Sequence, residues 1–86
     1  MTPNRKLPRI RGKELIRLVA KDGWVPGRFA RHGRTVTKKI GDRTRVTFIP
    51  DSRAELDEGT LAAIIGPKQM GIGKQGLWEL IDKYGL

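Results

Sequence analysis

Hydrophobic residues recur at helical spacing near the start of the chain. Leu15, Leu18 and Val19 fall on one face of a helix, and charged residues fill the opposite face. The pattern predicts a helix that begins near Gly12. It ends at Gly23, a residue suited to the left-handed conformation that closes many helices.

Three runs with strand character follow, at residues 24–31, 34–40 and 43–49. The first contains Pro26 and Gly27, which suit an edge strand or a bulge. The second and third are rich in Thr, Val and Ile and are separated by Gly41-Asp42, a two-residue turn. The pattern therefore predicts an antiparallel hairpin preceded by an edge strand.

The short turn fixes the register of this hairpin. If Ile40 pairs with Arg43, the numbers of paired residues sum to 83. One face should then pack inward and the other should form a basic outer surface. The inward pairs are Thr37 with Val46 and Thr35 with Phe48, and the outward pairs are Lys38 with Arg45 and Val36 with Thr47.

Two further helices are predicted, a short one at residues 60–65 and a longer one at about 74–84. Between them, Gly71, Gly73 and Gly76 spell the G-x-G-x-x-G pattern of dinucleotide sites. That motif requires a preceding strand and a following acidic residue about 20 positions on. No strand pattern precedes these glycines, and no acidic residue follows at that distance. We therefore interpret the glycines as a flexible turn into a helix.

The 86 residues correspond to one small domain, residues 1–86. There is no cysteine and a single histidine, so neither a disulfide framework nor a thiolate metal site is expected. We expect no metal and no cofactor. The longest apolar run, Leu61 to Ile65, is far shorter than the roughly 20 residues that cross a bilayer. We therefore expect no membrane association and a cytoplasmic protein.

Positive charge is concentrated in the first half of the chain. Residues 1–49 carry 14 Lys or Arg against 3 Asp or Glu, whereas residues 50–86 carry 4 against 6. The stretch from Arg28 to Arg45 holds seven cations, one acid and the histidine, His32. Such a field attracts nucleic acid, although a membrane surface or an acidic protein would also be attracted.

His32 belongs, by strand alternation, to the face of Arg34, Lys38 and Arg45. The register extended past the strand end brings it near Asp51. A lone histidine at a strand end is often a solvated surface residue. In a basic patch it can also exchange a proton near neutral pH.

Several segments together resemble the HicA family of toxin mRNA interferases, the partners of HicB antitoxins. They include GKEL at residues 12–15, Gly23-Trp24, RVTFIP at residues 45–50, Glu55-Leu56 and Gly59-Thr60-Leu61. The resemblance implies an α+β fold similar to that of double-stranded RNA-binding domains, with a three-stranded antiparallel sheet packed against helices. It also implies metal-independent cleavage of messenger RNA. The family's catalytic histidine falls by position on His32, which lies here in Ala-Arg-His-Gly instead of Gly-Ser-His.

RNA cleavage without a metal needs a base for the 2′-OH proton and a cation for the developing charge. His32 is the candidate base, and the absence of a second histidine predicts a slow enzyme. The candidate phosphate-binding residues are Arg28, Arg31, Arg34, Lys38 and Arg45. We expect a HicB-like antitoxin to cover this basic face, with acidic residues opposite Arg34 and Lys38.

Two other functions remain open. The same basic surface suits a non-catalytic module that binds double-stranded RNA, which would bind as well without His32. A DNA-binding accessory protein fits less well, because no helix-turn-helix with a basic second helix is apparent.

Overall fold

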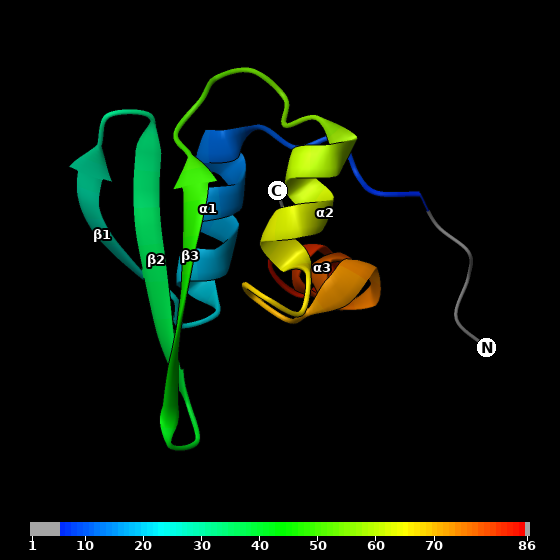
Figure 1. The fold of residues 1–86 in the computed structure, drawn as a ribbon. Helices are drawn as coiled ribbons and strands as arrows, with labels where there is room; N and C mark the ends of the chain where they lie inside the picture. The colour runs from blue at the N-terminus through cyan, green and yellow to red at the C-terminus, as the bar shows by residue number, and fades with distance from the viewer. Residues whose placement is uncertain (1–5, 86) are drawn as a thin grey trace.

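The structure is a computed structural model that describes residues 6–85. Figure 1 shows one layer of three strands, with α1 behind it and the other two helices to one side. The α+β architecture predicted from the sequence is confirmed. Its elements, in chain order, are α1 (Gly12–Lys21), β1 (Val25–Ala30), β2 (Gly33–Ile40), β3 (Arg43–Pro50), α2 (Glu58–Ile65) and α3 (Gly73–Tyr84).

Helix α1 buries the apolar stripe seen in the sequence, including Leu15, Leu18 and Val19. At its start, the backbone N–H of Arg11 donates a hydrogen bond of 3.0 Å to the side chain of Glu14. This contact satisfies one of the backbone donors near the helix end. The chain then reverses at Gly23, whose φ of 95° favours glycine.

The sheet is antiparallel with the strand order β1-β2-β3. The predicted hairpin register is confirmed: Ile40 pairs with Arg43, and the pairing continues to Gly33 with Pro50. Strand β1 lies at an edge, and its register with β2 shifts between Pro26 and Phe29. The irregularity expected from Pro26 and Gly27 is therefore present as well.

The prediction of which sheet face packs inward is wrong. Val36 and Ile49 are fully buried and Thr47 is 3% exposed, whereas Val46 is 53% and Phe48 39% exposed. We call the helix-covered side, with Val36, Thr47 and Ile49, the inner face. Both faces carry β-branched residues, so alternation alone does not assign them. The charges of Lys38 and Arg45 led to the prediction that their side of the sheet faces solvent. Their long side chains instead reach polar partners at the margin of the inner face.

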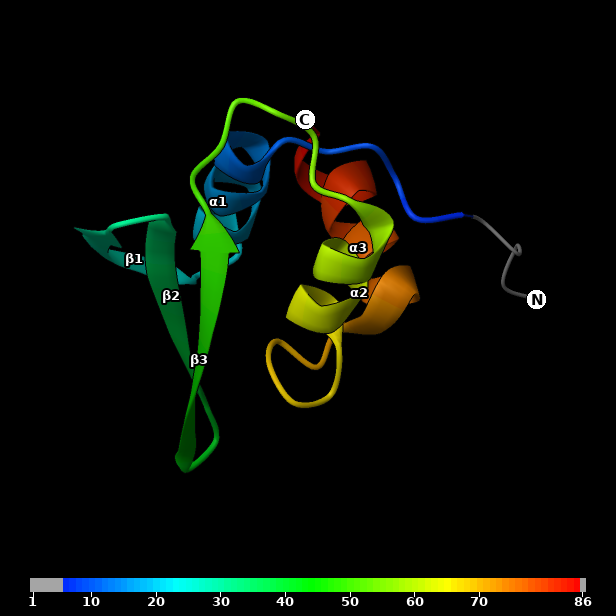
Figure 2. The same ribbon diagram turned by 45° about the horizontal axis from the view of Figure 1, so that its top comes forward.

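The core lies between the inner face and the three helices. Trp24, just before β1, is 2% exposed and is among the largest buried side chains. Figure 2 shows α2 and α3 next to each other, beside the sheet. At the end of α3, the hydroxyl of Tyr84 donates to the carboxylate of Asp22 at 3.3 Å, which connects α3 to the end of α1. Other buried apolar residues include Ile10, Leu15, Leu18, Val36, Ile49, Leu61, Met70 and Leu77.

Helix α2 begins two residues earlier than the sequence pattern suggested, because Asp57 caps it. Its carboxylate accepts a hydrogen bond of 2.9 Å from the backbone N–H of Thr60. Hydrogen bonds from the side chain and then the backbone of Thr60 hold the pKa of Asp57 below its ordinary value of 3.8.

This cap predicts a pH-dependent contribution to stability. Because the folded-state pKa is lowered, the contribution is present above pH 3.8 and is lost as the pH falls through the lowered pKa. We expect Asp57→Ala to melt at a lower temperature than the wild type at neutral pH, with the difference shrinking in acid. Thermal melts followed by circular dichroism across this range test it, and a difference independent of pH would contradict it.

Candidate nucleic-acid interface

The histidine lies in the tight turn between β1 and β2. Arg31 and His32 form the turn, and Ala30 pairs with Gly33 where the two strands meet it. Both turn side chains are exposed. Within residues 6–85, no hydrogen bond or ion pair orients the His32 imidazole. The side chain is therefore accessible to a large substrate such as RNA.

Gly33 fixes this turn against the end of β3. A Cβ atom at Gly33 would lie 2.8 Å from both the Phe48 ring and the Pro50 Cα, and closer still to the carbonyl oxygen of Ile49. Such contacts are shorter than carbon atoms tolerate. The absence of a side chain at residue 33 therefore lets β2 approach β3 directly beside His32.

Arg34 forms contacts that join β1 to β2. Its Nε and Nη2 donate to the carbonyl oxygen of Gly27 at 3.1 and 2.9 Å. Its guanidinium also lies 4.3 Å from the centre of the Phe29 ring. Arg28, in the irregular part of β1, is exposed. We call Arg28, Arg31, His32 and Arg34 the turn cluster, which includes His32 and three of the five predicted phosphate-binding residues.

Lys38 and Arg45 do not belong to this cluster. The Lys38 ammonium donates to the backbone carbonyl of Asp22 at 2.8 Å and pairs with its carboxylate at 3.1 Å. Arg45 Nη1 donates to the carbonyl oxygens of Pro67 and Gln69 at 3.2 and 2.9 Å. Lys38 lies six positions after His32 along β2, a separation of roughly 20 Å in extended strand. By the confirmed register, Lys38 and Arg45 lie on the same side of the sheet as Arg34, as predicted. That side is the inner face, however, and these two cations attach the sheet to α1 and to the loop after α2.

Asp51 is also engaged elsewhere. The confirmed register brings Gly33 opposite Pro50, one residue short of the predicted pairing between His32 and Asp51. The Asp51 carboxylate forms an ion pair of 3.1 Å with Lys13 of α1. This contact fixes the end of β3 to the first turn of α1, and within residues 6–85 no carboxylate forms an ion pair with the His32 imidazole.

Phe29 is a site residue that the sequence reasoning missed. It is 66% exposed and lies under the Arg34 guanidinium. An exposed aromatic ring among cations offers a surface on which an RNA base can stack. The signal was present in the sequence, because Phe29 directly follows Arg28 and lies two residues before Arg31.

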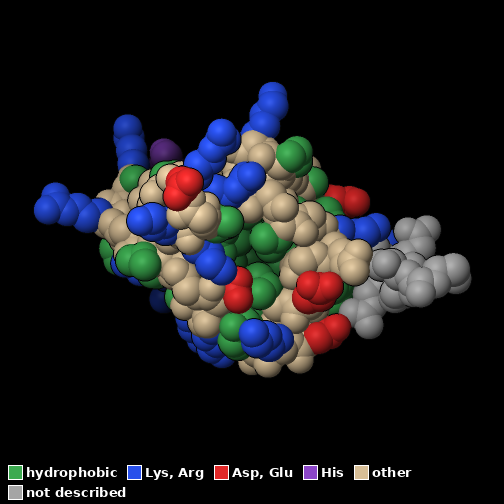
Figure 3. Space-filling view, turned by 90° about the horizontal axis from the view of Figure 1, so that it is seen from below, with side chains coloured by type: hydrophobic (Ala, Val, Ile, Leu, Met, Phe, Trp, Pro, Cys, Tyr) green, Lys and Arg blue, Asp and Glu red, His purple; other side chains and the backbone are tan. Residues whose placement is uncertain are grey.

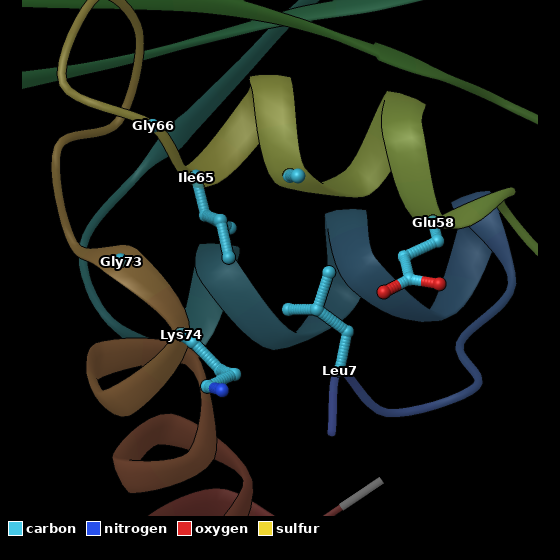
Figure 4. Close-up of a pocket in the computed structure, with 7 residues that line it drawn as sticks. Leu7, Glu58, Ile65, Gly66, Gly73 and Lys74 are labelled. Carbon is cyan, nitrogen blue, oxygen red and sulfur yellow. The ribbon is translucent and has the colours of Figure 1, made fainter. Parts of the chain in front are cut away.

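Positive charge extends beyond the turn cluster (Figure 3), and a hollow lies away from it. In Figure 3, Lys and Arg side chains project over much of the surface on the strand side. A hollow of about 290 Å³ lies on the helix side (Figure 4) and is lined by Leu7, Glu58, Ala62, Ile65, Gly66, Gly73 and Lys74. None of these lining residues belongs to the turn cluster.

The glycine-rich segment joins α2 to α3 and follows no strand, which confirms that it is not a dinucleotide motif.

Residues 6–85 contain no group of three or more His, Cys, Asp or Glu side chains placed to hold a metal ion. In the same part of the chain, no helix combines the length and apolar character needed to cross a membrane.

Comparison with known proteins identifies a family. A family model described as the HicA toxin of bacterial toxin-antitoxin systems matches residues 12–72, from the first residue of α1 to the residue before α3. Neither the curated proteins nor the solved structures contain a match to this chain. The family match covers more than two thirds of the sequence. The chain therefore belongs to the HicA toxin family of bacterial toxin-antitoxin systems.

Proposed function

We propose that this toxin is a metal-independent endoribonuclease that cleaves messenger RNA, with His32 as the general base. The observation that carries the proposal is the exposed position of the chain's single histidine in a turn flanked by arginines. Family membership supports the toxic role. The arginines supply positive charge where an RNA backbone would have to pass.

The reaction requires few groups. The neutral imidazole takes the proton of a ribose 2′-OH, and the 2′ oxygen attacks the adjacent phosphorus. The bond to the 5′ oxygen of the next nucleotide breaks, which yields a 2′,3′-cyclic phosphate and a 5′-hydroxyl end. Water protonates the leaving oxygen, because within residues 6–85 no second histidine is available. Protonation by water, without a positioned side-chain acid, is consistent with a slow enzyme.

The arginines of the turn cluster have different parts in this proposal. Arg28 and Arg31 are exposed and can rearrange to contact successive phosphates. Arg34 is held by Gly27 and Phe29, so it supplies a fixed charge close to the turn. A preorganised cation stabilises the charge that develops on the phosphate oxygens in the transition state.

A non-catalytic RNA-binding module remains the second candidate. It is favoured by one observation: no described residue orients the His32 imidazole, whereas catalytic histidines usually have such a partner. Binding by such a module would depend on the same arginines but not on His32. Comparing RNA cleavage by the wild-type chain and by His32→Ala separates the two candidates.

The turn cluster predicts the salt dependence of RNA binding. The logarithm of the association constant for single-stranded RNA falls with that of the salt concentration, with a slope of about −0.7 per neutralised phosphate. We expect the double variant Arg28→Gln with Arg31→Gln to bind RNA more weakly. The magnitude of its salt slope should be smaller than that of the wild type by about 1.4. Fluorescence anisotropy of a labelled RNA over a salt series measures both quantities.

A matched control removes two charges elsewhere. Lys74 and Lys83 are exposed on α3, outside the turn cluster, and their double change to Gln alters the net charge equally. This control should reduce the slope much less. Equal effects of the two double variants would mean that the RNA responds to overall charge and not to the turn cluster.

A further inference from the structure

The side of the sheet that faces away from the helices exposes a band of apolar and threonine side chains. Val25 is 63% exposed, Val46 53% and Phe48 39%. Val25 pairs with Thr37, which in turn pairs with Val46, so this row crosses all three strands, and Thr35 pairs with Phe48 in the row beside it. In Figure 1 no helix lies in front of this surface. We call it the outer face, made up of Val25, Thr35, Thr37, Val46 and Phe48.

Such a surface is unusual for a strand face in contact with water. Antiparallel sheets with one face covered by helices commonly carry polar residues on the other face. Here the row that crosses the sheet is Val, Thr and Val, with Phe48 next to it. Contiguous exposed apolar residues on a small protein commonly mark an interaction site.

The chemistry of the outer face favours a protein over RNA. Valine and threonine present no flat ring for base stacking and no cation for a phosphate. Phe48 is the single aromatic side chain of this face. Branched aliphatic groups instead suit the apolar centre of a protein interface.

The charges around the outer face define the partner further. Exposed Arg31 lies at the turn where β1 meets β2, and exposed Lys39 lies near the hairpin end of β2. A second copy of this chain would bring like charges together across the contact, because residues 1–49 carry 14 cations and 3 acids. An acidic rim around an apolar patch would complement this surface.

We propose that the outer face is the docking surface for an acidic partner protein, the antitoxin of this toxin. The inference rests on the proposed function, because an antitoxin has to restrain the activity assigned to His32. The outer face ends at the turn that carries Arg31 and His32. A partner seated on Val46 and Phe48 therefore also reaches the turn. The earlier expectation of acidic groups opposite Lys38 is replaced, since Lys38 is paired with Asp22.

The test uses the purified HicB-type antitoxin from the same source and a double variant, Val46→Thr with Phe48→Thr. Threonine keeps the strand propensity of these positions and removes apolar surface. We expect the dissociation constant to rise by at least about tenfold, as for central interface residues. The control is Ile40→Thr, which removes an apolar side chain that is 47% exposed at the hairpin end. This control should bind the antitoxin as the wild type does.

A second measurement does not depend on the variants. Adding antitoxin to the wild-type chain should shift or broaden the methyl NMR signals of Val25 and Val46. The signals of Ala62 and Ala63, exposed on α2, should not change. Unchanged signals from the two valines in a formed complex would overturn the proposal.

Three other outcomes would also overturn it. Equal antitoxin affinity of the wild type and the folded double variant would place the contact elsewhere. If the double variant lost RNA binding but kept its antitoxin affinity, RNA would be the molecule that binds the outer face. Concentration-dependent dimerisation of the wild type that is lost in the variant would make a second copy the occupant. Antitoxin binding is measured without RNA. These results can therefore be interpreted even if the protein proves not to be a nuclease.

Discussion

His32→Ala should lose RNA cleavage while it keeps the fold and most of the RNA affinity. Loss of a general base typically lowers the rate by about 10²- to 10⁴-fold, which would bring a slow enzyme close to background. The imidazole is exposed, so the stability should change by about 0.5 kcal/mol or less. RNA affinity rests on arginines that the substitution leaves in place. Cleavage rates, anisotropy with labelled RNA and a thermal melt measure the three quantities.

If His32→Ala, purified in parallel, cuts RNA at the wild-type rate, the catalytic assignment is wrong and the binding-module alternative takes its place.

Gly33→Ala should destabilise the protein and disturb the turn that carries His32. The added Cβ would be 2.8 Å from the Phe48 ring and from the Pro50 Cα, and the backbone at Pro50 cannot move away as a side chain could. Overpacking of this kind typically costs about 1 to 3 kcal/mol. We expect a lower free energy of unfolding in urea and a reduced cleavage rate, because the paired ends of β2 and β3 have to separate.

Gly59→Ala is the matched control for this substitution. Gly59 lies in α2, where an added Cβ meets no atom within 4 Å. Alanine should therefore be neutral or should stabilise the helix by up to about 1 kcal/mol. If both variants unfolded at the same urea concentration, the tight contact between Gly33 and β3 would lack energetic importance.

The hairpin could be predicted from local sequence because its causes are local. Gly41 has a φ of 62°, a conformation that glycine adopts readily in tight turns, and the short turn fixes every pair that follows. The first helix and its end at Gly23 are local in the same sense. These elements were predicted correctly without any knowledge of tertiary contacts.

The assignment of the sheet faces could not be made in this way, because the deciding contacts are distant in sequence. Lys38 binds a residue 16 positions earlier, and Arg45 binds Gln69, 24 positions later. The Thr47 hydroxyl forms a hydrogen bond with the Gln69 side chain, which makes a threonine acceptable in the core. The alternation of residues along a strand contains no information about these distant partners. The side of the sheet that carries Lys38 and Arg45 was therefore wrongly predicted to face solvent.

The candidate site was predicted in part for the same reason. Arg28, Arg31 and Arg34 lie within four residues of His32 in the sequence, so a single turn brings them together. Lys38 and Arg45 share a side of the sheet with Arg34, as predicted, but that side is the inner face and both cations have partners there. Phe29 was missed because the site prediction rested on charged residues and the histidine, and Phe29 is neither.

The central claim is that the His32 imidazole activates a ribose 2′-OH without a metal. The most direct measurement is mass spectrometry of the RNA fragments made by the wild-type protein in the presence of EDTA, on matched substrates with a ribose or a 2′-deoxyribose at the cleavage position. We predict fragments ending in a 2′,3′-cyclic phosphate and a 5′-hydroxyl from the ribose substrate, and no fragments from the deoxyribose substrate or from His32→Ala. Equal cleavage of both substrates, or 5′-phosphate ends, would contradict the account.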